Sequence, residues 1–233
     1  MQAKIFHQSS WARSSRGTPI EMYKKTHSRD GNATAPILFV GGVHGDEPEG
    51  VRLAQEFLKW LSEAESKSPE AILHSWILVP CLNVDGYLRN LRTNDNGVDL
   101  NRNFPARDWS PEAKAPRYYP GPQPSSELET QALVDLIKIE KPRLIVHFHS
   151  WEPCVVYTGH NGKNASEIIA GNSGYTVHED IGYPTPGSLG QYGWLEHQIP
   201  VVCIEEKEHI RLDLVWLNFE SGLKKLMTTD FET

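Results

Sequence analysis

The stretch Pro36–Gly50, PILFVGGVHGDEPEG, joins a short apolar run to two glycines and then to a histidine and a glutamate three residues apart. An apolar run of this length, bounded by proline and glycine, predicts a buried strand. A helix is predicted over residues 49–65 by apolar side chains at helical spacing, namely Val51, Ala54, Leu58 and Leu61. The stretch therefore predicts a strand, a turn and a helix in succession, which is the repeating unit of α/β folds.

The rest of the chain repeats this alternation. Further strands are predicted at residues 75–83, 143–150, 154–158 and 200–206. Helices are predicted within residues 125–142, 164–171, 188–198 and 212–227. Ser126 and Glu129 have the spacing of a capping box at the start of the first of these helices. The alternation predicts an α/β fold with a mixed, mostly parallel central sheet and helices on both faces, and we expect residues 1–233 to form one domain.

One long segment, residues 85–125, interrupts the alternation. It is rich in Asn, Gly, Pro and Arg and shows little periodicity. A long segment without regular structure inside a compact domain usually carries function. Ligands of open α/β sheets bind beyond the carboxyl ends of the strands, and several polar residues of this sequence follow predicted strands directly.

The composition narrows the possible partners and the compartment. The chain has a net charge of -7 and no stretch dense in Lys and Arg, which argues against a nucleic-acid partner. No apolar run is long enough to cross a bilayer, and the first 17 residues lack the apolar core of a secretory signal. Cys81, Cys154 and Cys203 are odd in number and widely spaced, as expected of reduced thiols. We therefore expect a cytoplasmic protein that does not bind a membrane.

His44 and Glu47 follow the first predicted strand directly. An imidazole and a carboxylate are suitable zinc ligands, but a catalytic zinc site needs a third protein ligand. Side chains alternate along a strand, so His147 and His149 share a face, and His149 lies nearer the carboxyl end. The alternative is that His44 only forms a hydrogen bond in the turn and that Glu47 caps the following helix. A pair of this kind is weak evidence for a metal by itself.

The stretch Leu91–Pro105, LRTNDNGVDLNRNFP, completes a longer pattern. The pattern comprises an HxxE pair after a strand, Arg-x-Asn, DxNRN, a later His-Ser after a strand, and a glutamate that ends a late strand. All of these features occur in this order between His44 and Glu205. The pattern resembles the zinc metallocarboxypeptidases of the carboxypeptidase A type. This resemblance implies the carboxypeptidase-like fold, a hydrolase of the metallopeptidase class, and one Zn²⁺ per chain.

The resemblance implies that His44, Glu47 and His149 hold zinc. It also implies that Glu205 is the general base, which takes a proton from water and passes it to the leaving amine. Glu206 is the competing residue. Strand alternation sends the two glutamates to opposite faces, and the family spacing after PVV selects Glu205.

The resemblance also implies a set of residues that bind substrate. Arg92 would stabilise the carbonyl oxygen as it becomes an oxyanion. Asn101 and Arg102 would hold the free carboxylate of the released residue, because a planar guanidinium suits bidentate carboxylate binding. Tyr183 would close over the substrate, although it could equally be a packed aromatic residue beside two prolines. Leu189 would lie at the floor of the pocket by family spacing.

Three neighbouring residues have less specific roles. Asp99 is expected to orient a ligand histidine or an arginine and not to bind the metal itself. His147 is expected in the core or beside a ligand. Arg89 is the alternative to Arg92, and only the spacing to Asn94 separates the two.

Three further stretches are similar to the bacterial murein tripeptide amidases, a subgroup of this family. They are NGVDLNRNFPARDW (residues 96–109), ELETQAL (residues 127–133) and IGYPTPGSLGQYGW (residues 181–194). Those enzymes release meso-diaminopimelate from the murein tripeptide L-Ala-γ-D-Glu-meso-diaminopimelate during cell-wall recycling. The segments HSWEP (residues 149–153) and CIEEKEH (residues 203–209) depart from the amidase pattern near the pocket. These departures affect the expected substrate more than the expected chemistry.

Two other functions compete with the amidase. An N-acyl amino acid deacylase of the aspartoacylase or succinylglutamate desuccinylase type shares the GxxHGxExxG turn, but such enzymes usually add a second β-rich domain. A non-catalytic module that binds peptidoglycan peptides would be expected to lack a ligand or the base, and all of these residues are present here. The pattern therefore favours an enzyme with a small peptide substrate.

Overall fold

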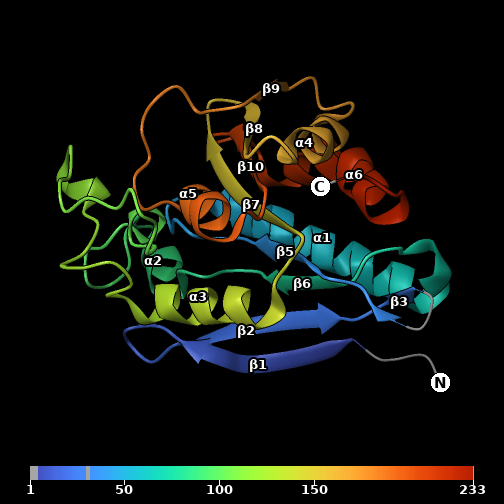
Figure 1. Cartoon of the computed structure of the whole chain (residues 1–233), viewed down its shortest axis with the longest axis horizontal. Helices are drawn as coiled ribbons and strands as arrows, with labels where there is room; N and C mark the ends of the chain where they lie inside the picture. Colours follow the sequence, from blue (N-terminus) through green and yellow to red (C-terminus); the bar gives the residue numbers. More distant parts are fainter. Residues whose placement is uncertain (1–4, 30–31, 233) are drawn as a thin grey trace.

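The computed structural model describes residues 5–29 and 32–232 (Figure 1). Its centre is an eight-stranded sheet in the order β1-β2-β6-β5-β7-β10-β8-β9. The strands are β1 (Phe6–Arg13), β2 (Pro19–Lys25), β5 (Ile37–Val40), β6 (Trp76–Val79), β7 (Leu144–Trp151), β8 (Cys154–Thr158), β9 (Thr176–His178) and β10 (Val201–Lys207). A separate small sheet pairs β3 (Ser28–Arg29) with β4 (Asn32–Ala33).

The sheet is mixed, with a parallel centre. Strands β6, β5, β7 and β10 run parallel to one another. On one side β2 and β1 follow in antiparallel order, and on the other side β8 pairs antiparallel with β10 and parallel with β9. This arrangement confirms the predicted fold class.

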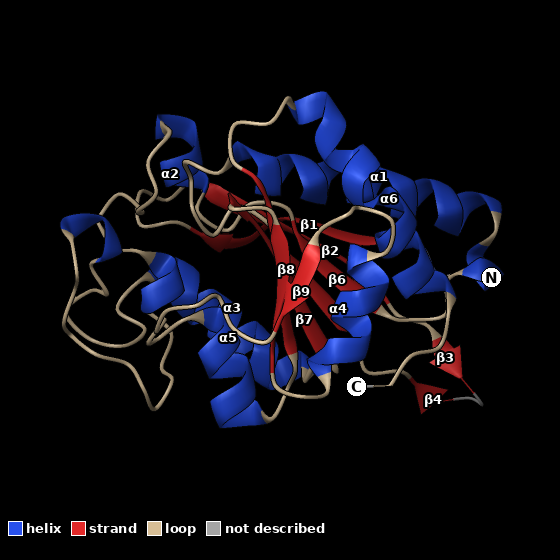
Figure 2. Ribbon diagram, turned by 90° about the horizontal axis from the view of Figure 1, so that it is seen from above, coloured by secondary structure: helices blue, strands red, loops and turns tan. Residues whose placement is uncertain are grey.

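Helices cover both faces of the sheet (Figure 2). α1 (Pro48–Lys67), α4 (Gly162–Ala170) and α6 (Leu212–Thr228) cover one face, and α3 (Leu128–Glu140) and α5 (Leu189–Gln191) cover the other. Side chains of β5 divide between the two cores, with Ile37 and Phe39 in the first and Leu38 and Val40 in the second. Burial on both faces explains why this strand is apolar throughout.

The pairing of β7 with β10 positions polar residues at the carboxyl edge. His147 lies opposite Cys203, and His149 lies opposite Glu205. These side chains continue the face of Ile145, which packs in the second core. Paired residues in adjacent strands point to the same face, so the two histidines and Glu205 emerge together where this core ends.

The structure differs from the sequence predictions in several places. The strands β1, β2, β3, β4 and β9 were not predicted. The segment 85–125 is not wholly irregular, because it overlaps α2 (Val84–Arg89) and contains the short helices η2 (Leu100–Arg102) and η3 (Pro116–Tyr118). The predicted capping box is wrong: α3 has no side-chain cap, and Glu129 instead accepts hydrogen bonds from Ser15.

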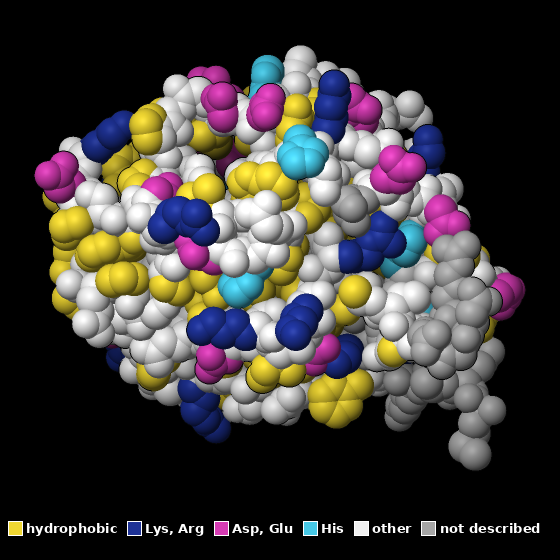
Figure 3. All heavy atoms as spheres, in the orientation of Figure 1, with side chains coloured by type: hydrophobic (Ala, Val, Ile, Leu, Met, Phe, Trp, Pro, Cys, Tyr) yellow, Lys and Arg dark blue, Asp and Glu magenta, His cyan; other side chains and the backbone are white. Residues whose placement is uncertain are grey.

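The remaining elements lie at the periphery or follow α5. η1 (Pro69–Ala71) follows α1, and a π-helical turn, η4 (Tyr192–Glu196), continues α5. No helix within residues 5–29 and 32–232 is long and apolar enough to span a bilayer. Lys and Arg side chains are interspersed with Asp and Glu over the face seen in Figure 3.

Candidate metal centre and active site

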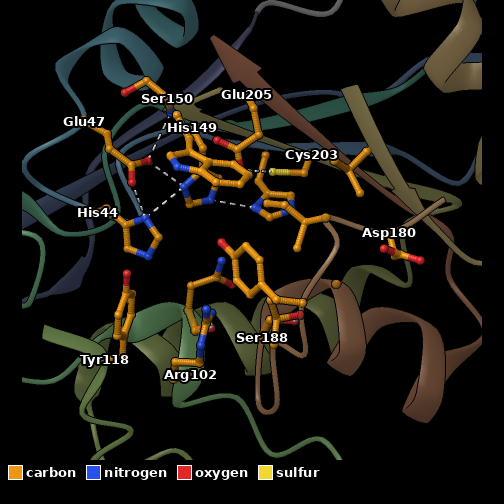
Figure 4. Close-up of a pocket in the computed structure, with 18 of the residues that line it drawn as sticks. His44, Glu47, Arg102, Tyr118, His149, Ser150, Asp180, Ser188, Cys203 and Glu205 are labelled. Atoms are coloured by element: carbon orange, nitrogen blue, oxygen red, sulfur yellow. Dashed lines mark hydrogen bonds and ion pairs between the residues drawn. The ribbon is translucent and has the colours of Figure 1, made fainter. Parts of the chain in front are cut away.

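A cavity of about 600 Å³ opens at the carboxyl edge of the sheet, beyond β5, β7 and β10 (Figure 4). Its lining includes almost every site residue that the sequence predicted. The segment 85–125 supplies one wall and the segment 179–191 another. Segments distant in sequence therefore converge on one site at the carboxyl edge of the sheet, where ligands of α/β folds are expected to bind.

His44, Glu47 and His149 meet at the base of this cavity. His44 lies in the turn after β5, Glu47 immediately precedes α1, and His149 belongs to β7. Nδ1 of His44 lies 2.7 Å from Glu47 Oε1 and 3.0 Å from His149 Nδ1. Nδ1 of His149 lies 2.7 Å from Glu47 Oε2. Two imidazole nitrogens and a carboxylate thus face one point, and all three side chains are buried.

This donor set fits a zinc ion. Zn–N and Zn–O bonds of about 2.0–2.2 Å in a tetrahedral site place neighbouring ligand atoms roughly 3.3 Å apart. The observed separations of 2.7–3.0 Å are only a few tenths of an ångström shorter. Small side-chain movements would therefore admit the ion, and the open cavity leaves room for water and substrate beside it.

Polar contacts orient His44 and Glu47. His44 Nε2 lies 3.0 Å from Asp99 Oδ1, so a proton on this nitrogen leaves Nδ1 free to bind a metal. The Ser150 backbone N–H donates to Glu47 Oε2 at 3.2 Å. Asp99 thus takes the orienting position that the sequence predicted for it.

A second group, His147, His149 and Cys203, also brings potential ligands together. His147 Nδ1 lies 2.9 Å from His149 Nε2, the nitrogen that faces away from His44. Burial raises the pKa of the Cys203 thiol well above its ordinary value, and the neighbouring Glu205 raises it further. Since a metal binds the thiolate form, these surroundings favour the set that contains Glu47.

The charges at the base of the cavity are strongly coupled. Burial opposes ionisation of Glu47, yet His44 and His149 hold the pKa of its carboxyl well below the ordinary value. Burial and Arg92 act to lower the pKa of His44, but the carboxylates of Glu47 and Asp99 outweigh them and raise it. The ionised carboxylates of Glu47 and Asp99 therefore favour positive charge beside them, which is the electrostatic condition for binding a cation.

Glu205 lies beside this group and Glu206 points away from it. Burial, together with the nearby charge of Glu47, raises the pKa of Glu205 to about 8. The Cys203 thiol lies 3.2 Å from Glu205 Oε1. Glu206 lies on the opposite face of β10, where it accepts hydrogen bonds from Tyr175 and from Asn218 at 2.8 Å. Only Glu205 therefore reaches the cavity.

Arg92 reaches the metal-facing group from the long segment. Its Nε donates to Asp99 Oδ2 at 3.0 Å and its Nη1 to Glu47 Oε1 at 3.2 Å. Arg89 instead pairs with Asp95 and is half exposed outside the cavity. The structure thus brings Arg92, and not its sequence rival, to the site.

Asn101 and Arg102 line the adjoining wall. The Leu189 backbone N–H donates to Asn101 Oδ1 at 2.9 Å, which leaves the Asn101 side-chain N–H groups as available donors. Arg102 Nη1 donates to the Asn101 carbonyl at 2.6 Å, and Arg102 is largely buried. An amide N–H group and a guanidinium on one wall can together receive a carboxylate.

The two remaining predicted residues have different outcomes. Tyr183 lines the cavity, is 40% exposed, and meets the Trp151 ring edge-on at 5.7 Å. The placement of Leu189 at the pocket floor is wrong: its side chain is fully buried in the second core. Residues that line the cavity around this position are polar or small, namely Thr158, Ser188, Gly190 and Gln191.

The sequence missed a cluster on the wall nearest the metal-facing group. The Tyr118 ring has three guanidinium carbons around it, at 5.1 Å for Arg92, 5.9 Å for Arg102 and 5.5 Å for Arg117. Arg117 also pairs with Asp46 at 3.5 Å. The only sequence signal for Arg117 and Tyr118 was their location in the segment 85–125. Their contacts join loop residues, and no periodic pattern in the sequence predicts such contacts.

Comparisons with known proteins agree with this geometry. The family model described as zinc carboxypeptidase matches residues 1–191. Murein peptide amidase A of Escherichia coli K12 is 35% identical over 166 residues, which cover 66% of this chain and 64% of that protein. Murein peptide amidase A of Vibrio campbellii is 28% identical over 180 residues, which cover 72% of this chain and 68% of that protein.

Solved structures show the same fold. The crystal structure of murein-tripeptide amidase MpaA from Escherichia coli O157 superposes with a TM-score of 0.77 at 28% identity, over 98% of this chain and 93% of that chain. Bovine thrombin-activatable fibrinolysis inhibitor superposes with the same TM-score of 0.77 at 17% identity, over 97% and 88%. The family match ends before β10 and does not include Glu205, whose position beside His149 follows from the pairing of β10 with β7. The chain belongs to the zinc carboxypeptidase family.

Proposed function

We propose that this chain is a zinc-dependent hydrolase that cleaves an amide bond next to a free carboxylate. The observation that carries the proposal is the convergence of His44, Glu47 and His149 in one cavity with Glu205 and a carboxylate-binding wall. Family membership supports the choice of zinc. Residues 1–233 would act as one catalytic domain.

The chemistry divides between the metal and the protein. Zinc held by His44, Glu47 and His149 would supply Lewis acidity at the scissile carbonyl and lower the pKa of a bound water. Glu205 would accept a proton from the attacking water and deliver it to the leaving amine. Because burial and the charge of Glu47 raise the pKa of the Glu205 carboxyl to about 8, Glu205 would be able both to accept and to release a proton near neutral pH.

The arginines would act at different stages. Arg92 would stabilise the negative charge that develops on the carbonyl oxygen in the transition state. Asn101 and Arg102 would hold the carboxylate of the released residue in both the ground state and the transition state. A fixed anchor beside the scissile bond confines cleavage to the terminal residue.

We propose the bond between γ-D-Glu and meso-diaminopimelate in the murein tripeptide as the substrate, with the reaction in the cytoplasm. The names of the Escherichia coli and Vibrio campbellii relatives support a murein peptide as substrate, and the solved murein-tripeptide amidase of Escherichia coli O157 supports the tripeptide. The polar lining around Thr158, Ser188 and Gln191 suits a side chain with a charged far end better than an apolar floor would. The three cysteines are unpaired, which supports a reducing compartment.

The test is incubation of the zinc-loaded protein with murein tripeptide, murein tetrapeptide and simple N-acyl amino acids, followed by mass spectrometry. The tetrapeptide replaces the anchored carboxylate with an amide and leaves Arg102 unpaired, a loss of about 3–5 kcal/mol. We therefore expect tripeptide turnover to exceed tetrapeptide turnover by roughly two to four orders of magnitude in kcat/KM. Equal rates would refute the carboxylate anchor, and rapid cleavage of an acyl amino acid would support a deacylase instead.

A further inference from the structure

Arg117 carries a positive charge that the proposed chemistry does not use. It lies in η3 and lines the cavity together with its ion-pair partner Asp46. Its side chain is 55% exposed, and no hydrogen bond within the described part of the chain engages its guanidinium. Two side chains that line the metal-facing wall therefore form a loose pair, and the arginine retains free N–H groups.

Tyr118 holds this guanidinium close to the reaction centre. Arg92 and Arg117 contact the same Tyr118 ring, at 5.1 and 5.5 Å. Asp46 separates His44 from Glu47 in the chain. Figure 4 shows Tyr118 and Asp180 on opposite sides of the cavity. Arg117 is thus placed near the oxyanion arginine and on the side away from Asp180.

We propose that Arg117 binds a second carboxylate of the substrate, the α-carboxylate of the γ-linked D-glutamyl residue on the acyl side of the scissile bond. This inference rests on the proposed function. In a γ-linked residue the α-carboxylate lies about 5 Å from the scissile carbonyl carbon in an extended chain, from carbon–carbon bonds near 1.5 Å. Arg117 contacts the same ring as Arg92 and pairs with Asp46, the residue directly before Glu47, so we place this carboxylate beside Arg117.

The geometry explains why Asp46 does not exclude this role. The Arg117–Asp46 separation of 3.5 Å leaves the ion pair loose. A guanidinium presents five N–H donors along more than one edge, so it can face two carboxylates at once. Asp46 and Tyr118 together hold the Arg117 head near the cavity, although more than half of its side chain is exposed. Arg117 would therefore determine specificity and would not take part in bond cleavage.

The experiment compares γ-D-Glu-meso-diaminopimelate peptides that carry a free α-carboxylate with matched peptides that carry an α-carboxamide. The wild-type protein should cleave the acid with a kcat/KM about two- to fivefold higher, the range for a half-exposed ion pair, and mainly through KM. Arg117→Ala should lose this preference and cleave both peptides at the lower value. Arg117→Lys should keep part of it.

Binding provides a second readout. Calorimetry on the Glu205→Gln protein should show tighter binding of the acid than of the carboxamide, and adding Arg117→Ala should equalise the two. Arg13→Ala, which removes an arginine that lies outside the cavity, should leave the preference unchanged.

The outcomes separate the two proposals. Arg117 does not bind this carboxylate if the wild-type protein cleaves the acid and the carboxamide at equal rates, or if Arg117→Ala keeps the preference for the acid. The proposed function would still stand in either case. If the wild-type protein releases diaminopimelate from neither peptide, the proposed function fails and the role of Arg117 fails with it.

Discussion

The two histidines of β7 differ in what they face, and this difference can be measured. His149 Nδ1 points at His44 and Glu47, whereas His147 reaches only the outer nitrogen of His149. His149→Ala should therefore lose zinc, as measured by metal analysis after dialysis. His147→Ala should still bind zinc with an affinity lower by about 10- to 100-fold, because it removes only an orienting partner. The reverse pattern would show that the metal uses the His147 side of β7.

The adjacent glutamates of β10 provide a second test. Glu205→Gln should abolish turnover while zinc content and fold persist, because an amide cannot accept the proton of water. Glu206→Gln should keep substantial turnover but lower the free energy of unfolding by about 1–3 kcal/mol, because Glu206 accepts buried hydrogen bonds from Tyr175 and Asn218. Activity assays and urea unfolding of both variants measure these effects. Equal losses of activity would contradict the strand register.

The two cavity arginines should affect different kinetic constants. Arg92→Ala should lower kcat about 100- to 1,000-fold with little change in KM, because it removes stabilisation made in the transition state. Arg102→Ala should raise KM, and poorer alignment of the substrate should lower kcat as well. Steady-state kinetics on murein tripeptide distinguish the two. If Arg92→Ala changed only KM, Arg92 would be the residue that binds the substrate carboxylate and Arg102 the residue that stabilises the oxyanion.

At the scale of single residues, the sequence predicted those site residues whose positions depend on strand alternation or on a linear motif. The position nearer the carboxyl end of the strand selected His149, and the family spacing after PVV selected Glu205. Alternation placed the two histidines on one face and the two glutamates on opposite faces. It could not orient Leu189, because that residue begins a short helix whose backbone, and not its side chain, contacts Asn101. It could not find Arg117 or Tyr118, because loop contacts follow no period.

At the scale of elements, the contact between α1 and β7 controls the spacing of the metal ligands. Gly50 lies in the first turn of α1, and an added Cβ would come within 2.3 Å of the Phe148 carbonyl oxygen, next to His149. Gly50→Ala should force α1 away from β7, separate Glu47 from His149, and lower the stability by about 1–3 kcal/mol.

Zinc affinity, measured by competition with a chelator, should fall in the Gly50→Ala protein. Gly162→Ala is the matched control, because its Cβ would meet no atom closer than the Tyr157 Cβ, at 3.2 Å, and α4 lies away from the ligands. A normal zinc affinity in Gly50→Ala would mean that the first turn of α1 does not set the position of Glu47.

The elements that the sequence predicted best are those buried on both faces. β5 and β6 are apolar throughout, and β7 and β10 begin with apolar runs, because helices cover both sides of these strands. These runs are conspicuous in the sequence. β1 and β2 lie at the edge of the sheet, and β1 is largely exposed, so no apolar run marks it. The π-helical turn Tyr192–Glu196 was predicted only as part of a longer helix, since its apolar spacing resembles that of an α-helix.

At the scale of the whole molecule, zinc should stabilise the fold. His44 and Glu47 precede His149 by about a hundred residues, so one ion would join the turn after β5, the start of α1 and β7. Zinc at 100 times its Kd contributes about 2.7 kcal/mol, or a rise in Tm of roughly 5–11 °C for a chain of this size. Calorimetry before and after treatment with a chelator measures the shift. His7→Ala should retain it and His149→Ala should lose it, whereas a Tm insensitive to zinc would argue against the site.

The position of β10 also affects how the chain folds as it is synthesised. β10 is the last strand in sequence, yet it inserts between β7 and β8. During synthesis, the edges of β7 and β8 that will pair with β10 stay unpaired until residue 207 has emerged from the ribosome. Unpaired edges of apolar strands are prone to aggregation. Glu205 belongs to this last strand. A chain that ended before β10 would therefore lack both the complete sheet and the proposed base.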